Sequence, residues 1–207
     1  MGKIEGSSFT GENMRKQFAP KAFTLIFVAI VVNIVLEEIV RGLQLPLYFN
    51  LMATIIVALI AGPLIGVIVG FITNVCLYFM IDTLYLPLSV VSIVSALCVG
   101  LLLRRGYFIT LKGAIISLII TTLVVVLTSS FKAILLYGGE SETGGPWEIA
   151  NIYSSVSETF VSALLTMTFI PNLIEIVLSF VGAHVALNVL PQDWISLFAR
   201  EARGKER

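Results

Sequence analysis

Apolar residues fill six stretches of the chain, and polar residues lie mostly in the connections between them. The stretches cover residues 22–42, 48–61, 63–80, 86–103, 111–137 and 158–190. A helix needs about 20 consecutive apolar residues to cross a hydrocarbon core of ~30 Å. The pattern therefore predicts an all-α integral membrane protein with six transmembrane helices. The second stretch is short for a full crossing, and we expect it to be tilted or flanked by a partly buried loop.

Composition supports a membrane protein. Hydrophobic residues make up 57% of the 207-residue chain and charged residues only 13%, whereas a soluble domain normally carries about 25% charged residues. The two cysteines, Cys76 and Cys98, lie inside apolar runs, so they do not indicate a disulfide framework.

The distribution of basic residues predicts the orientation and the domain limits. Eleven of the 13 lysines and arginines lie in residues 1–21, 104–112 and 200–207. Six crossings put all three groups on one side, and the positive-inside rule makes that side the cytoplasm. We therefore expect cytoplasmic N- and C-termini, with a cytoplasmic N-terminal segment at 1–21, a transmembrane domain at 22–190 and an interfacial tail at 191–207.

A row of small residues runs through the second and third stretches. Proline suits the first turn of a helix, so Gly62–Pro63 predicts a break between two helices. Gly62, Gly66 and Gly70 are spaced by four, and Asn74 continues the row. Residues four apart share one face of a helix, and helices in a bilayer associate through small residues. We therefore assign the three glycines to helix packing.

Polar residues within the spans gather in the half that the predicted orientation places outside. An ionised side chain in a span costs ~3 kcal/mol or more unless it faces a partner or a water-filled cavity. We therefore expect one polar cavity open to the outside. Its predicted substrate-binding residues are Glu37, Glu38, Arg41, Asn74, Lys132 and Glu175, with Trp147 and Tyr153 on the outer loop 138–158 that closes it.

Structural roles remain open for several of these residues. Glu38 and Arg41 are three residues apart, a spacing that also allows an ion pair along one helix. Asn74 suits a hydrogen bond between helices as well as a ligand contact. Glu175 follows the helix disruption at Pro171, so its carboxylate fits either the floor of a binding site or a structural hydrogen bond.

The segment LPLYFNLMATIIVALIAGPLIGVIVGFITNV (45–75) resembles the substrate-binding S component of energy-coupling factor (ECF) vitamin transporters. The residues that carry the match are Gly62, Pro63, Gly66 and Gly70, together with six short spans in about 200 residues. Members of that family often have an acidic residue where this chain has Asn74. The resemblance implies a multi-pass protein of a bacterial or archaeal plasma membrane that captures a water-soluble vitamin or related micronutrient from outside.

The same resemblance implies partners. An S component docks on a transmembrane T component driven by two ATPase subunits, and the chain has no phosphate-binding G-x4-G-K-[ST] loop of its own. Family members commonly carry an A-x3-A pattern on the first helix where it meets the T component. Here Ala22 and Ala29 are seven residues apart, and two turns still allow both on one face, so they are the predicted docking residues.

Two other functions compete with this one. EEIVR (37–41) and HVALN (184–188) look similar to the motifs of intramembrane CAAX-type proteases. However, the glutamate motif is one residue short, and His184 is the only histidine, while that chemistry uses two. A membrane sensor or scaffold subunit is the third possibility. We predict a small-molecule substrate and a bilayer environment, with no catalytic residue, metal, cofactor or nucleic-acid partner.

Overall fold

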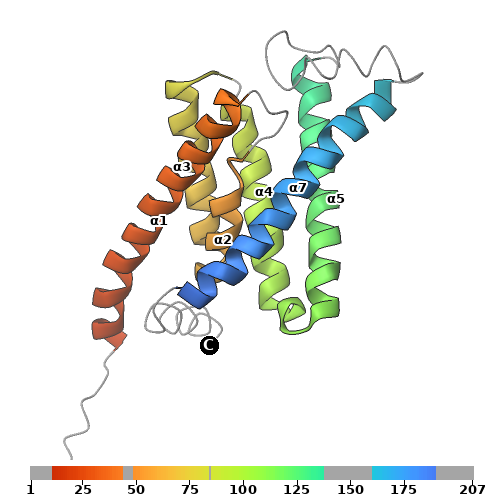
Figure 1. Ribbon diagram of the computed structural model, residues 1–207. Coiled ribbons are helices and arrows are strands. Elements are labelled where there is room, and N and C mark those ends of the chain that lie inside the picture. The colour runs from red at the N-terminus through yellow and green to blue at the C-terminus, as the bar shows by residue number, and fades with distance from the viewer. Residues whose placement is uncertain (1–10, 44–48, 84, 138–159, 190–207) are drawn as a thin grey trace, which may run out of the picture.

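Figure 1 shows the fold in a computed structural model that describes residues 11–43, 49–83, 85–137 and 160–189. These residues form six α-helices and one short 3-10 helix, and no β-strand occurs among them. The helices are α1 (Gly11–Gly42), α2 (Met52–Ala61), α3 (Pro63–Met80), α4 (Tyr85–Arg104), α5 (Leu111–Tyr137) and α7 (Phe160–Val189), with the 3-10 helix η1 (Tyr107–Ile109) between α4 and α5.

Five helices have the length and apolar composition needed to cross a membrane. The crossing segments are Pro20–Gly42, Pro63–Met80, Tyr85–Arg104, Leu111–Phe131 and Phe169–Ala186. Large apolar side chains cover their outward faces; Phe23 is 73% exposed and Leu127 63% exposed. Exposed apolar surface on this scale suits hydrocarbon rather than water. The chain is an all-α, multi-pass membrane protein, as the sequence predicts.

The second predicted span is not a full crossing. α2 has 10 residues and rises about 15 Å at 1.5 Å per residue, half of a ~30 Å hydrocarbon core. It packs against α1, α3, α4 and α7, so it lies at the centre of the bundle. α2 is therefore too short for a full crossing, as the sequence predicts for 48–61, and the chain enters α2 partway through the bundle.

The helices alternate in direction, so several connections lie at one end of the bundle (Figure 1). The start of the α1 crossing, the α2–α3 junction, the η1 turn and the end of α7 lie together there. A packed group of Ala22, Ile60 and Ala186 joins three of these elements. Arg104, Arg105 and Lys112 are exposed beside η1, and we call this side the basic end.

The predicted domain limits stay a prediction. α1 begins at Gly11, so residues 11–21 of the predicted N-terminal segment are helical and continuous with the first crossing helix. The predicted tail 191–207 lies outside the described residues.

The three glycines of the predicted packing row have two different roles. Gly62 has φ +93°, which L side chains rarely adopt, and no atom lies near its missing Cβ. It therefore serves the break between α2 and α3, with Pro63 in the first turn of α3, and its assignment to helix packing is wrong. A Cβ on Gly66 would lie 2.7 Å from Cβ of Ala58 in α2, and one on Gly70 would lie 2.8 Å from Cβ of Ser92 in α4. Close packing is confirmed for these two.

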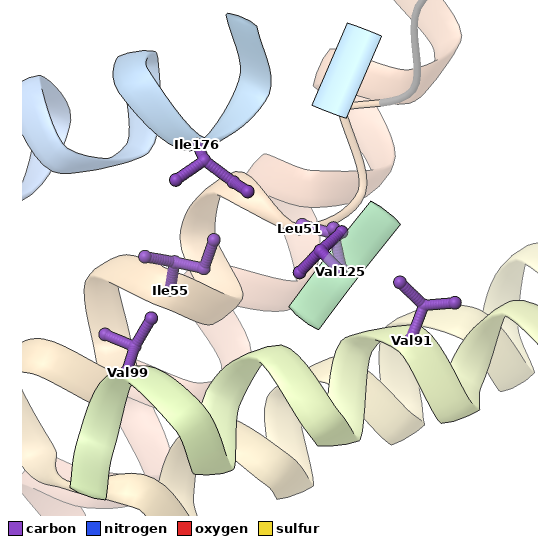
Figure 2. Packing of buried hydrophobic residues seen from close by; sticks show 6 residues of the cluster. All are labelled: Leu51, Ile55, Val91, Val99, Val125 and Ile176. Carbon is purple, nitrogen blue, oxygen red and sulfur yellow. The ribbon is translucent and has the colours of Figure 1, made fainter. Parts of the chain in front are cut away.

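The apolar core lies between α2, α4, α5 and α7 (Figure 2). Its buried members are Leu51, Ile55, Val91, Val99, Val125 and Ile176. Leu51 directly precedes α2, so the core holds the start of the short helix against its neighbours. Many small dispersion contacts of this kind stabilise helix association where the surrounding lipid is equally apolar.

Candidate functional site

Buried polar side chains from four helices surround the start of α2. We call this set the α2-cap cluster, and it consists of Asn33, Glu37, Asn50, Thr54, Thr73, Asn74, Tyr85, Ser92 and Glu175. Its members are at most 6% exposed. They come from α1, α3, α4 and α7 and from the turn and first residues of α2 itself.

The two carboxylates of the cluster bind the turn that leads into α2. Glu175 of α7 accepts a hydrogen bond from the backbone N–H of Leu51 at 2.7 Å. Glu37 of α1 accepts one from the backbone N–H of Phe49 at 2.9 Å and another from the Tyr85 hydroxyl at 2.6 Å. One three-residue turn therefore connects α1 to α7 through two glutamates.

Asn33 joins the middle of α1 to α2 and α3. Its side-chain oxygen accepts a hydrogen bond from the backbone N–H of Ala53 at 2.8 Å. Its amide nitrogen donates to the hydroxyls of Thr54, at 3.0 Å, and Thr73, at 3.3 Å. The side chains of Asn33, Thr54 and Thr73 are fully buried. The amide of Asn33 therefore links α1, α2 and α3 inside the bundle.

Asn74 forms the other side of the cluster. Its oxygen accepts a hydrogen bond from the Asn50 amide at 2.9 Å. Its nitrogen donates to the Gly70 carbonyl and to the Ser92 hydroxyl, both at 2.7 Å. The amide that ends the glycine row therefore continues the same contact with α4 that Gly70 makes by close packing.

α2 needs hydrogen-bond acceptors from other helices because it begins inside the bundle. The first N–H groups of any helix lack partners within that helix, and an unsatisfied group costs several kcal/mol where no water is available. Leu51 stands at the N-cap position and has no polar side chain. Side chains of α1 and α7 supply the missing acceptors, so a helix can begin inside the membrane.

The structure brings three of the predicted substrate-binding residues together. Glu37, Asn74 and Glu175 all belong to the α2-cap cluster, and each makes hydrogen bonds within the protein. Glu38 and Arg41 instead pair with each other at 3.4 Å, with side chains 42% and 53% exposed. The structure does not bring this pair into the cluster.

The remaining predicted residues cannot be placed at the site. The side chain of Lys132 lies outside what the structure describes, as do Trp147 and Tyr153 on the loop 138–158. Their predicted contacts with a substrate therefore stay predictions.

The predicted docking residues of α1 lie inside the protein. Ala22 is 8% exposed and packs with Ile60, while Ala29 is 4% exposed and packs with Val57 and Val69. Both alanines face α2 and α3. Their small side chains allow α1 to approach these helices closely. In this arrangement they leave no surface for a partner, and the docking assignment is corrected.

Sequence reasoning missed Asn33 and Tyr85. Asn33 is an amide within the apolar run of α1, and such a residue normally faces the bundle interior, so this signal was present in the sequence. Tyr85 lies at the start of α4, where an interfacial tyrosine is ordinary. Nothing in its local sequence indicates a contact with Glu37, 48 positions earlier.

The cluster offers carboxylate, amide and hydroxyl groups that can bind polar groups. Its described members are carboxylates, amides and hydroxyls, and no group of three or more histidine, cysteine or acidic residues suited to a metal occurs in the described part of the chain. His184 is exposed near the end of α7, beside Ala186, which packs against Ala22. Glu37 lies 15 residues beyond Ala22 along α1, about 22 Å away at 1.5 Å per residue.

Comparison of the chain with protein-family models, with curated proteins and with solved structures gave no match.

Proposed function

We propose that the chain is a substrate-capture subunit of an ECF-type importer in a bacterial or archaeal plasma membrane. In this proposal it binds a small water-soluble vitamin or related micronutrient from outside. A T component and two ATPase subunits then drive import as an ABC transporter complex. The α2-cap cluster is the observation on which the proposal rests.

The depth of the cluster supports a transport role. Transporters place substrate sites near the bilayer midplane, at the ends of discontinuous helices. α2 is a helix of this kind, because it has 10 residues and begins at the Phe49–Leu51 turn inside the bundle. Intramembrane ionisable groups are themselves a functional signal, and Glu37 and Glu175 both lie at this point.

The chemistry of the cluster suggests which solutes would bind. A carboxylate offers about four acceptor positions, while Glu37 accepts two hydrogen bonds, from Phe49 and Tyr85. A solute that carries amine, amide or hydroxyl donors has acceptors to meet there. We therefore propose that such donors, rather than an anionic group, enter the cluster.

The end of α1 and the start of α4, which contribute Glu37 and Tyr85 to the cluster, lie on the side opposite the basic end (Figure 1). In the proposal, a solute arrives from this side, and the two glutamates hold the base of the entrance. Glu38 and Arg41 keep a proposed role at its exposed rim.

Native mass spectrometry of the purified chain tests the function directly. We expect a retained small molecule of defined mass, and a thermal shift when the matching compound from a panel of water-soluble vitamins is added. We expect Glu37→Gln to lose the retained molecule, whereas Arg105→Gln, which changes an exposed residue at the basic end, serves as the control and should keep it.

Co-purification separates the importer from a sensor or scaffold. An importer subunit is expected to co-purify with a T component and two ATPases when all four are expressed together, and to support uptake. A chain that retains no small molecule and responds to no vitamin in the panel would contradict the proposal.

A further inference from the structure

The inner face of α5 carries polar groups that the α2-cap cluster does not use. Ser117, Thr121 and Thr122 are at most 2% exposed. Within the described part of the chain, Ser117 Oγ and Thr122 Oγ1 have no hydrogen-bond partner. Thr121 Oγ1 makes only a long contact with the sulfur of Cys98, at 3.8 Å.

Other buried hydroxyls of the bundle behave differently. Ser95 and Ser179 donate to carbonyls of their own helices at 2.9 and 2.6 Å. Thr54 and Thr73 accept hydrogen bonds from Asn33. A serine or threonine in a helix usually finds the carbonyl one turn earlier, so two orphaned hydroxyls on one helix are an exception that requires a partner.

The register of α5 shows where these hydroxyls lie. Thr122 is one turn from Leu118 and one turn from Val125, and both of these pack in the core cluster with Val99 of α4 and Ile176 of α7. Ser117 is one turn before Thr121, which contacts α4 through Cys98. Ser117 and Thr121 therefore lie in one row towards α4, and Thr122 lies about 100° further around the helix, beside the core cluster. All three face the interior of the bundle, where α5 packs against α4 and α7.

We propose that the inner face of α5 binds ordered water within the membrane, through the hydroxyls of Ser117, Thr121 and Thr122. Water both donates and accepts, as a hydroxyl requires, and buried waters bind to otherwise unsatisfied polar groups. An ion is a poor fit, because Leu118, Val125 and Ile176 give the surroundings an apolar character.

The proposed waters extend the polar region of the bundle. At 1.5 Å per residue, Ser117 and Thr122 lie ~9 Å and ~16 Å along the axis from the first residue of α5. Val125, one turn after Thr122, shares the core cluster with Leu51 and with Ile176, the residue after Glu175. The waters therefore lie between the neighbourhood of the α2-cap cluster and the basic end. This inference does not depend on the proposed function or on any transported solute.

Cysteine accessibility tests the proposal in membranes. In a background of Cys76→Ala and Cys98→Ala, the variants Ser117→Cys and Thr122→Cys are treated with the small thiol reagent methanethiosulfonate ethylammonium. Ser117 and Thr122 are at most 2% exposed, so the reagent reaches either position only when the bundle opens locally. A thiol beside bound water ionises more readily than one in dry apolar surroundings, so we expect both variants to react faster than the matched control Val125→Cys, which lies in the apolar core.

A thermal measurement gives the second readout. Thr122→Val keeps the shape and removes the hydroxyl. Loss of a bound water is expected to lower the Tm, as loss of a protein hydrogen bond does in the control Thr54→Val. A dry, unpaired hydroxyl would give the opposite sign, with a Tm higher by about 2–4 °C. A raised Tm, or labelling of Ser117→Cys and Thr122→Cys no faster than of Val125→Cys, would overturn the proposal.

Discussion

The carboxylate of Glu175 accepts a hydrogen bond at 2.7 Å from the backbone N–H of Leu51, which lies 124 positions earlier in the chain. Through this bond α7 caps a helix to which it is not adjacent in sequence. Leu51 also packs in the apolar core with Ile176, the residue after Glu175. Polar capping and apolar packing thus act on the same pair of segments, and together they fix where α2 begins.

Replacement of Glu175 is expected to show how much its hydrogen bond to Leu51 contributes to the stability of the protein. Glu175→Leu leaves the N–H of Leu51 without an acceptor and should lower the free energy of unfolding by about 2–3 kcal/mol. Glu175→Gln keeps a carbonyl acceptor and should lower it less. Unfolding followed in detergent measures both, with the exposed Glu38→Gln as control. Equal stability of the Leu and Gln variants would contradict a capping role.

Asn33 is expected to couple three helices energetically. Asn33→Leu removes one acceptor and two donor contacts and should destabilise the protein by about 2–3 kcal/mol. In a double-mutant cycle with Thr73→Val, the coupling energy should be about 0.5–1.5 kcal/mol. Asn33 and Ser179 share no hydrogen bond, so the cycle with Ser179→Ala should give additive effects. Coupling of the same size in both cycles would show that the effect is not specific to the Asn33 contact.

The close approach of α2 and α3 at Gly66 predicts a rescue. Gly66→Ala would place a methyl group 2.7 Å from Cβ of Ala58, and such overpacking typically costs about 1–3 kcal/mol. The second change Ala58→Gly removes the clashing methyl but leaves Cα of residue 58 at 3.0 Å, so the double variant should recover part of the lost Tm. A double variant less stable than Gly66→Ala would argue against this contact.

Labelling in intact cells tests the orientation. In the background without Cys76 and Cys98, Thr83→Cys in the α3–α4 connection should react with a membrane-impermeant maleimide. Arg105→Cys at the basic end should react only after the membrane is permeabilised, because the positive-inside rule places that end in the cytoplasm. Both residues are exposed in the structure, so access to each thiol depends on the side of the membrane. The reverse labelling pattern would show that the topology is opposite to the one predicted.

Local sequence was sufficient where the determining physics was local. Apolar runs of membrane length predicted the crossing helices, and glycine followed by proline predicted the break at Gly62–Pro63, which the structure has. The spacing of Gly66 and Gly70 indicated close packing, and the structure supplies Ala58 and Ser92 as the neighbours. In each case the signal is the hydropathy, the spacing or the backbone preference of a few neighbouring residues in the chain.

The candidate site was only partly predictable for the same reason. Glu37, Asn74 and Glu175 stood out as polar residues in apolar runs, and the structure brings them together. Their hydrogen-bond partners include backbone groups of Phe49 and Leu51, and backbone groups leave no mark in a sequence. The alanines predicted to meet a partner proved to face α2 and α3 instead, because hydropathy does not distinguish lipid from another helix of the same chain.

The sequence by itself determined that this chain is a bundle of apolar membrane helices, with one break and one close-packed glycine face. Only the tertiary structure decided that α2 begins inside the bundle and that Asn33, Glu37 and Glu175 cap it. The physical reason is that a buried N–H must find an acceptor wherever the helices place it. The depth and rotation of α1 and α7 relative to α2 set that position, and no linear pattern of residues records them.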